Sequence, residues 1–418
     1  PGDASIQRPR GPLEGVVEHP GEEPPGDAQE DPEDPGGPHG GPAQARFVFL
    51  DGNGLPERWN GRERFVILET GFGLGLNFLA TLQAWRGQPG KLHYVAIEKH
   101  PFSLQDLRTL HDRYPEFQKE AAELHSHWPP LVPGGHRAEL GNVVLTLFFS
   151  DIGIARDLRM KADAFYLDGF APARNPDMWT PALMRSLSRL AAPGATAATW
   201  SVATPVRHAL EATGWEVEKR KGFGDKKEML IARSRRGEEP VRPQRKAIVV
   251  GAGLAGAAVC ERLCARGWEV TLHEKHAEPA MEASGNHAGA FHPVATPDDS
   301  VFARLTRAGF LYALKNWSRL EGVRWDACGA LQLSRDAKEE SSQQKAALGQ
   351  PSDYLQYVDR EEAPRHAGVE LAAGGLWFPQ GGWIQPRSLV KAQLKDVSVK
   401  YGSEVKAIDY DSVVILAN

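Results

Sequence analysis

Two glycine-rich turns constrain this chain more than any other feature, because each follows an apolar run and leads into a helical pattern. The first glycine loop covers residues 69–75, ETGFGLG, and the second glycine loop covers residues 251–256, GAGLAG. Glycine has no Cβ, so the backbone can come close to a ligand, and the first N–H groups of the following helix are free to donate. The sequence therefore predicts two nucleotide-binding turns in two α/β units.

A strand–helix alternation surrounds the first glycine loop and starts again at the second. Alternation of this kind indicates a mostly parallel sheet with helices on both faces. In the first unit we expect strands at 47–50, 64–69, 91–98, 143–149, 163–168 and 196–200, and helices at 74–85, 102–110 and 181–190. In the second we expect strands at 247–250, 270–273 and 413–418, and a helix at 254–266.

Composition indicates where these units end. Residues 1–44 hold ten Pro, nine Gly and no aromatic residue, with ten acidic against two basic side chains. Such a segment cannot bury enough apolar surface to offset its ordering entropy, which indicates a disordered acidic tail. Residues 235–245 are charged and proline-rich, which indicates a linker. We therefore expect a first unit at residues 45–234 and a second unit at residues 246–418.

The whole-chain properties narrow the class of protein. The length of 418 residues fits two domains, and no apolar run reaches the roughly 18 residues of a membrane span. Three cysteines cannot build a disulfide framework, which indicates a reducing, cytoplasmic setting. The chain opens with Pro1 and no leader pattern, so we expect a fragment. Outside the acidic tail the net charge is +3, which permits a nucleic-acid partner without requiring one.

The first glycine loop does not have the spacing of a dinucleotide site. The positions three beyond Gly73 and Gly75 are Leu76 and Phe78, so G-x-G-x-x-G fails. The pattern instead looks like the nucleoside-binding loop of class I methyltransferases, whose cofactor is S-adenosylmethionine. Acids at strand ends could bind the ribose and adenine, or could simply cap the next helix. The expected S-adenosylmethionine contacts are Glu69, Gly71, Gly73, Gly75, Glu98, Ser150 and Asp151.

The second glycine loop matches the full dinucleotide fingerprint. A strand runs directly into G-x-G-x-x-G, a helix follows, and Glu274 ends the next strand, 18 residues beyond Gly256. Residues 283–290, ASGNHAGA, resemble the segment that wraps the flavin in D-amino-acid and glycine oxidases, which favours FAD over NAD. The expected FAD contacts are Gly251, Gly253, Gly256, Glu274, Ser284, Gly285 and Asn286. For His287 and His292 we expect packing roles, and we expect no metal site.

Several longer motifs resemble one family. They are FLDGNGLPERW at 49–59, ETGFGLGLNF at 69–78, DGFAPARNPDMW at 168–179, KGFG at 221–224, KEM at 227–229, ASGN at 283–286 and the segment at 374–386. Together they resemble the bifunctional tRNA 5-methylaminomethyl-2-thiouridine biosynthesis proteins, the MnmC family. The resemblance implies a class I methyltransferase Rossmann-like domain followed by an FAD-binding domain of the glycine and D-amino-acid oxidase type.

The resemblance also implies two reactions on the wobble uridine of tRNA in the cytoplasm. The first unit would methylate the aminomethyl group, with Asp168 accepting and orienting the amine N–H. A helix-capping role for Asp168 is the alternative. Phe170, Pro172 and Asn175 would contact the substrate. The second unit would pass a hydride from the N–CH2 carbon of a carboxymethylaminomethyl group to the flavin, and hydrolysis of the imine would leave the aminomethyl product.

Several alternatives stay open at this point. The family pattern continues well beyond residue 418, so we expect a C-terminally truncated oxidase domain that cannot support full turnover. The basic stretch at 219–246 is either a tRNA contact or a plain solvated surface. One rival function is a methyltransferase–oxidase that acts on a small free amine or amino acid. Another is a non-catalytic cofactor-sensing or tRNA-binding module.

Overall fold

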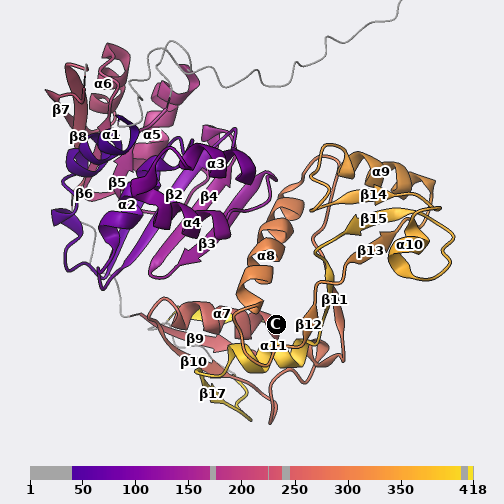
Figure 1. The fold of residues 1–418 in the computed structure, drawn as a ribbon. Coiled ribbons are helices and arrows are strands. Elements are labelled where there is room, and N and C mark those ends of the chain that lie inside the picture. The colour runs from indigo at the N-terminus through magenta and orange to yellow at the C-terminus, as the bar shows by residue number, and fades with distance from the viewer. Residues whose placement is uncertain (1–39, 170–175, 225, 238–244, 406–412, 418) are drawn as a thin grey trace, which may run out of the picture.

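The computed structural model describes residues 40–169, 176–224, 226–237, 245–405 and 413–417. Most of the segment predicted as an acidic tail, and residues 238–244 of the predicted linker, lie outside this range. Within it, two separate α/β units follow one another along the chain (Figure 1).

The first unit is built on an eight-stranded sheet in the order β3-β4-β2-β1-β5-β6-β8-β7. The five central strands are parallel, and both edges are antiparallel. This confirms the predicted mostly parallel sheet. The strands are β1 Arg64–Glu69, β2 Lys91–Glu98, β3 Gly134–Leu140, β4 Val143–Phe149, β5 Ala162–Tyr166, β6 Ala191–Thr199, β7 Trp215–Lys221 and β8 Glu228–Ser234.

Helices cover both faces of this sheet and form two apolar cores. One core lies under α2 and α4 and contains Phe78, Trp85 and Phe117. The other lies under α5 and α6 and contains Leu187 and Leu210. Buried on both faces, β1 is a continuous apolar run between its first residue, Arg64, and its last, Glu69, as is typical of parallel central strands. The helices are α1 Gly40–Gln44, α2 Leu76–Trp85, α3 Leu104–His111, α4 Gln118–Ser126, α5 Pro181–Leu190 and α6 Thr204–Glu211.

The predicted strand at 47–50 is wrong. These residues belong to a π-helical segment, Ala45–Leu50, followed by a short 3₁₀ turn at Asp51–Asn53. A short apolar run is compatible with either a strand or a buried helix, so its periodicity could not decide. Tertiary packing decides: Val48, Phe49 and Leu50 are buried in the core under α2, and Asn53 donates to the carbonyl of Phe49 at 2.9 Å.

The second unit starts with a four-stranded parallel sheet in the order β17-β10-β9-β18. Its strands are β9 Lys246–Val250, β10 Glu269–His273, β17 Ser398–Lys400 and β18 Val413–Leu416. Helices α7, Leu254–Cys264, and α11, Pro386–Gln393, pack on this sheet around Val249, Cys260 and Val390. The two sheets are separated in the chain by residues 235–245, the segment predicted as a linker.

Two small antiparallel sheets complete the second unit, in the orders β11-β16-β12 and β13-β15-β14. Their strands are β11 Gly289–Phe291, β12 Trp325–Asp326, β13 Ala330–Leu333, β14 Gln356–Val358, β15 Gly375–Phe378 and β16 Gly382–Ile384. The remaining helices are α8 Val301–Trp317, α9 Ala337–Ala347 and α10 Ala363–Ala367.

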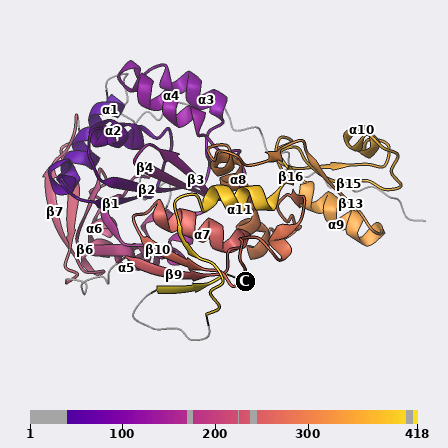
Figure 2. The same cartoon turned by 90° about the horizontal axis from the view of Figure 1, so that it is seen from below.

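Helix α8 joins the two units by lying beside β3 of the first unit (Figures 1 and 2). Arg262 of α7 pairs with Glu139 of β3 at 2.9 Å, and Tyr312 of α8 donates to the same carboxylate at 3.2 Å. The ammonium of Lys315 donates to the carbonyl of His127 at 2.7 Å. These contacts tie the second unit to the antiparallel edge of the first sheet.

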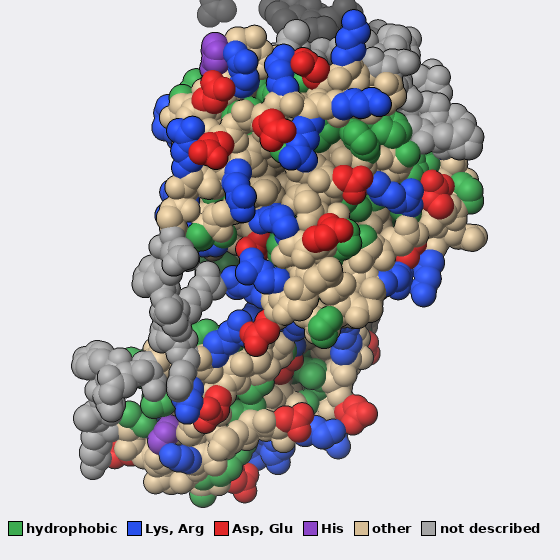
Figure 3. All heavy atoms as spheres, turned by 90° about the vertical axis from the view of Figure 1, so that its left-hand side faces the viewer, with side chains coloured by type: hydrophobic (Ala, Val, Ile, Leu, Met, Phe, Trp, Pro, Cys, Tyr) green, Lys and Arg blue, Asp and Glu red, His purple; other side chains and the backbone are tan. Residues whose placement is uncertain are grey.

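Several side chains of the basic stretch at 219–246 form ion pairs where the structure describes them. Lys219 pairs with Glu228 at 2.7 Å, and Arg235 pairs with Glu216 at 3.3 Å. Figure 3, which shows the face at the left of Figure 1, has Lys and Arg side chains interspersed with Asp and Glu. Contact of this stretch with tRNA stays a prediction.

The described residues bear on two further points, membrane spans and metal sites. None of the helices found there is long and apolar enough to cross a membrane. Nor do the described His, Cys, Asp and Glu side chains form a group of three or more that could hold a metal ion.

Candidate active site and cofactor loops

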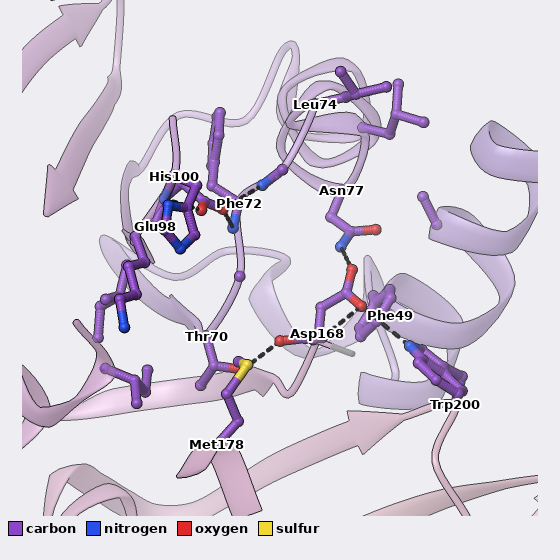
Figure 4. Close-up of a pocket in the computed structure, with 18 of the residues that line it drawn as sticks. Phe49, Thr70, Phe72, Leu74, Asn77, Glu98, His100, Asp168, Met178 and Trp200 are labelled. Atoms are coloured by element: carbon purple, nitrogen blue, oxygen red, sulfur yellow. Dashed lines mark hydrogen bonds between the residues drawn. The ribbon is translucent and has the colours of Figure 1, made fainter. Parts of the chain in front are cut away.

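A cavity of about 840 Å³ opens where the parallel strands of the first unit end (Figure 4). In open α/β sheets, ligands bind at this carboxyl edge. The cavity brings together most of the predicted first-unit site residues. Its lining includes Phe49, Thr70, Gly71, Phe72, Gly73, Leu74, Asn77, Glu98, Lys99, His100, Ser150, Asp151, Asp168, Asp177, Met178, Trp200 and Lys226.

The glycines of the first loop have different roles. A Cβ on Gly71 would come within 3.0 Å of the carbonyl oxygen of Asp168, so this position keeps the loop close to β5. Gly75 has φ +74° and is the N-cap of α2, a left-handed conformation that favours glycine. Gly71 and Gly73 are on the cavity wall, whereas Gly75 is not. Gly75 therefore forms the turn into α2, and its contact with the cofactor stays a prediction.

Glu98, at the end of β2, holds the first glycine loop in place. Its Oε2 accepts from the backbone N–H groups of Phe72 at 3.1 Å and Gly73 at 2.8 Å. Its Oε1 accepts from the N–H of His100 at 2.7 Å. Glu98 also lines the cavity, so binding of a ribose by this carboxylate, which stays a prediction, would use a side chain that the loop already orients.

Glu69 lies behind the loop and not on the cavity wall. Its side chain is fully buried and accepts from Asn77 Nδ2 at 2.8 Å and from the hydroxyl of Tyr94 at 2.9 Å. Burial raises the pKa of Glu69 well above its usual value, and the negative charge of Asp168 adds to this shift. The structure therefore gives Glu69 contacts with protein groups that support the site.

Asp168 follows β5 and points its carboxylate into the site (Figure 4). Oδ2 accepts from Asn77 Nδ2 at 2.7 Å, and Oδ1 accepts from the indole N–H of Trp200 at 3.2 Å and from the N–H of Gly169 at 2.9 Å. Burial raises the pKa of Asp168, and these hydrogen bonds oppose the shift. Among the described residues, no helix starts here that Asp168 could cap; the next element starts at Pro176.

Asn77, Trp200 and Lys226 were missed by the sequence reasoning. Asn77 donates both amide hydrogens to carboxylates, one on Glu69 and one on Asp168. It is a polar residue in the first turn of a mostly apolar helix, directly after the glycine loop, a signal that could have identified it. Trp200 and Lys226 come from segments far along the chain, after β6 and before β8, and only the fold brings them to Asp168.

Ser150 and Asp151 line the opposite side of the cavity, after β4. Asp151 accepts from the N–H of Gly153 at 2.9 Å and pairs with Lys99 at 3.3 Å. The hydrogen bond from Gly153, with help from Lys99, lowers the pKa of Asp151. The predicted substrate residues Phe170, Pro172 and Asn175 lie outside the described residues.

The second glycine loop connects β9 to α7, and its glycines are required by crowding. A Cβ on Gly256 would lie 1.9 Å from the carbonyl oxygen of Gly251, and a Cβ on Gly251 would lie 2.3 Å from that of Ala417. Glu274, at the end of β10, accepts from the N–H of Ala252 at 2.7 Å and from that of His276 at 2.9 Å. The acid and the loop are therefore joined, as in the first unit.

The remaining predicted FAD contacts lie beside this loop. Ser284 Oγ accepts from the N–H of Leu254, the first residue of α7, at 3.0 Å, and a Cβ on Gly253 would lie 3.0 Å from the same oxygen. Gly285 and Asn286 follow in the same short segment. The ring of His292 packs on Phe378 with centroids 5.0 Å apart, a structural contact.

Two protein families match parts of this chain. The family described as S-adenosyl-L-methionine-dependent methyltransferase matches residues 115–235, and the family described as FAD dependent oxidoreductase matches residues 246–417. The chain therefore combines a methyltransferase-type domain with an FAD-dependent oxidoreductase-type domain.

Similarity to curated proteins goes further. The chain is 51% identical over 371 residues to the tRNA 5-methylaminomethyl-2-thiouridine biosynthesis bifunctional protein MnmC of Azoarcus sp., covering 85% of this chain and 58% of that protein. It is 48% identical over 396 residues to the MnmC protein of Cupriavidus necator, covering 88% of this chain and 60% of that protein. The chain belongs to the MnmC family. It spans about three fifths of the length of these relatives.

A solved structure of MNMC2 from Aquifex aeolicus is also similar to this member of the MnmC family, with 20% identity and a TM-score of 0.39, covering 48% of this chain and 63% of that one. The residues present fit the two cofactors that the family matches name. The first loop offers glycines, backbone N–H groups and an oriented acid beside a large cavity. At the second, the strand-to-helix turn is so tight that a Cβ would not fit, as a pyrophosphate-binding turn requires.

Proposed function

We propose that the first unit methylates the amine of an aminomethyl group on the wobble uridine of tRNA. The observation that carries this proposal is the half-buried Asp168 carboxylate beside the first glycine loop, in a chain about half identical to proteins named for this modification. The donor, S-adenosylmethionine, supplies an electrophilic methyl group. The chain's own residues bind the donor, orient the acceptor and take up a proton.

Asp168 would orient the acceptor amine and take up its proton. An alkyl ammonium has no lone pair, so the amine must be neutral before it can accept a methyl group. A carboxylate that accepts from the N–H of the neutral amine orients the nitrogen and can then take up the proton that the methylated ammonium releases. Asn77 and Trp200 hold that carboxylate through both of its oxygens, which restricts its rotation. Fixed orientation of this kind is a large part of the rate gain in a transfer between two bound groups.

We propose the remaining site assignments on the same basis. Glu98, Ser150, Asp151, Gly71 and Gly73 would contact S-adenosylmethionine, with Glu69 and Gly75 acting through the loop. Phe170, Pro172 and Asn175 would contact the acceptor. The domain boundaries at 45–234 and 246–418, and a cytoplasmic location where tRNA is modified, belong to the same proposal.

For the second unit we propose oxidation of the carboxymethylaminomethyl side chain of the same uridine. FAD, when bound, accepts a hydride from the N–CH2 carbon. Gly251, Gly253 and Gly256 would bind its pyrophosphate, Glu274 its ribose, and the segment from Ser284 to Asn286 would flank the flavin. The product of this reaction carries the aminomethyl group that the first unit would use, which gives the fusion a chemical purpose.

The test is mass spectrometry of tRNA nucleosides after incubation with the purified protein and deuterated-methyl S-adenosylmethionine. We expect one labelled methyl on aminomethyl-uridine in tRNA that carries this group, and none on tRNA that lacks it. Free glycine and methylamine, incubated in parallel, test the small-amine alternative. Label on these amines but not on tRNA would overturn the proposal in favour of that alternative, and label on neither would remove both.

A further inference from the structure

Lys226 stands on the face of Trp200 at the wall of the first-unit cavity. Its Nζ lies 3.7 Å from the centroid of the indole ring, well within the range of a cation–π interaction. Both side chains line the cavity together with Asp168. The indole therefore holds a positive charge at a defined place in the site.

The same indole also holds Asp168. Its edge donates the N–H to Asp168 Oδ1 at 3.2 Å, while its face carries the ammonium of Lys226 (Figure 4 shows Trp200 and Asp168). A single rigid side chain thus places a cation beside the carboxylate. The charge of Lys226 opposes the rise in the pKa of Asp168 that burial causes.

The other charges around this site explain why such a cation matters. Glu69 faces Asp168 through Asn77, and Glu98, Asp151 and Asp177 are on the cavity wall. The remaining basic groups on this wall among the described residues are Lys99, which pairs with Asp151, and His100. A cavity so rich in acids would stabilise an acceptor amine as its ammonium, the form that cannot accept a methyl group.

We propose that Lys226, held on Trp200, is a positioning residue that keeps Asp168 ionised and the acceptor amine neutral. The proposal rests on the proposed methyl transfer. In that step the N–C bond forms as the S–C bond of the donor breaks. The sulfonium becomes a neutral thioether, and one proton of the methylated ammonium passes to Asp168. A nearby cation favours the reactant state in which Asp168 is charged and the amine is not.

The first test is the pH profile of methyl transfer under single-turnover conditions, in the wild-type protein, Lys226→Met and Lys226→Arg. Loss of the cation raises the pKa of both the carboxyl and the bound amine, so the acidic limb of the Lys226→Met profile should move up by about one pH unit. Lys226→Arg keeps the charge and should restore the wild-type limb. A structural role would instead lower the rate of Lys226→Met equally at every pH, with its limb unmoved, and would overturn the proposal.

The second test needs no tRNA and no activity. Protein labelled with ¹³C at the aspartate carboxyl carbons is titrated by NMR, and the Asp168 signal is identified by its loss in Asp168→Asn. We expect its midpoint at higher pH in Lys226→Met than in the wild-type protein and Lys226→Arg. Equal midpoints would refute the electrostatic link. A shifted midpoint in a protein that transfers no methyl to tRNA would instead leave the link standing and contradict the proposed function.

Substitutions of Trp200 test whether the indole face is what holds the charge of Lys226 near Asp168. Trp200→Phe keeps an aromatic face for Lys226 but loses the N–H donated to Asp168, whereas Trp200→Leu loses both. If the face matters, Trp200→Leu should raise the Asp168 midpoint further than Trp200→Phe. Equal midpoints in the two variants would show that the indole face does not hold the charge. Thermal unfolding of each variant checks that the fold is intact.

Discussion

The two glycine loops of this protein share one hydrogen-bonding arrangement. In each, the acid that ends the neighbouring strand accepts from a backbone N–H of the loop and from the N–H two residues further along its own chain. Glu98 does so with Gly73 and His100, and Glu274 does so with Ala252 and His276. A carboxylate of this kind fixes the loop and, at the same time, is placed to meet a ribose.

What lies behind the two loops differs. The first is backed by a polar network in which Asn77 joins Glu69 to Asp168. The second is backed by an apolar core around Val249, Ala257 and Cys260. Under the proposed function, the polar network behind the first loop would supply the carboxylate that takes up a proton, whereas the second loop would bind the flavin that supplies the redox chemistry.

The largest expected effect comes from the polar network. Asp168→Asn keeps the shape of the side chain but removes the base, and a positioned general base contributes typically 10²–10⁴-fold to a rate. We expect a fall of that order in single-turnover methyl transfer, with unchanged affinity for FAD measured by flavin fluorescence. An unchanged rate would show that the network is structural. The raised pKa of Asp168 also predicts loss of wild-type activity on acidification at a pH above that of an ordinary aspartate.

The second prediction compares glycines. A Cβ at position 256 would lie 1.9 Å from a backbone oxygen, so Gly256→Ala should push α7 away from β9 at a cost of about 3 kcal/mol. Gly73 has φ +50° and open space around its Cβ position, so Gly73→Ala should cost only the left-handed strain, about 1–2 kcal/mol. Hydrogen exchange of β9 and β1 measures each effect. Similar costs at both positions would contradict the assignment of crowding to one loop and backbone conformation to the other.

The third prediction concerns pH and the first unit. Burial lowers the pKa of His136 to about 4, and its Nδ1 has no hydrogen-bond partner among the residues that the structure describes. In the unfolded chain this side chain takes up a proton near pH 6.5, whereas in the folded chain it stays neutral down to about pH 4. The stability that neutral His136 contributes is therefore present above pH 6.5 and is lost as the pH falls towards 4. His136→Gln should remove up to about 3 kcal/mol of this acid sensitivity.

The comparison of wild-type protein with His136→Gln has to be made at each pH, because Glu69 and Asp168 have raised pKa values and titrate with the opposite sign. Hydrogen exchange of β4 at pH 7 and pH 4.5 provides the measurement, with β10 of the second unit as the internal reference. Equal acid sensitivity in the two proteins would show that His136 is protonated without unfolding.

The smallest effect, a change in cofactor affinity, is expected from the hydrogen bonds that Glu98 and Glu274 accept from their loops. In Glu98→Gln and Glu274→Gln, an NH2 group replaces one of the carboxylate oxygens that accept from backbone N–H groups. The lost hydrogen bond should destabilise each loop by about 1–2 kcal/mol. We expect roughly tenfold weaker binding of S-adenosylmethionine in the first variant and of FAD in the second, by calorimetry. Each variant serves as the control of the other. A loss of both ligands in one variant would contradict two independent binding loops.

Much of the fold could be predicted from local pattern. The strands at 64–69, 91–98 and 143–149 and the helix at 181–190 agree with the structure to the residue, because each is a strongly apolar or amphipathic run between clear turn signals. The antiparallel strands β3, β7 and β8 were not predicted. They are partly exposed; β3 and β7 are the edge strands and β8 lies next to an edge, where the apolar pattern is weak. The short run at 47–50 was misassigned because a buried turn of helix has the same composition as a buried strand.

Some residues of the candidate site could likewise be predicted from local pattern, and others could not. Gly71, Gly73, Glu98 and Asp168 could be predicted because strand ends and glycine turns are local in sequence. The buried role of Glu69 could not be predicted. Whether an acid at a strand end faces a ligand or the protein interior depends on the helix and strands packed around it. Asn77 carried a local signal that went unused. Trp200 and Lys226 carried none that ties them to Asp168.

By itself the sequence determined two α/β units, each with a bare backbone turn and an acid on the adjacent strand, because those features depend on neighbouring residues and on the geometry of parallel strands. Only the tertiary structure decided which side chains hold the predicted carboxylate, Asp168, and how deeply it is buried. Asp168 acquires its partners from α2, from the end of β6 and from the segment before β8, and these meet only when the sheet is complete. Burial and fixed donors then set its charge, and both are properties of the assembled fold.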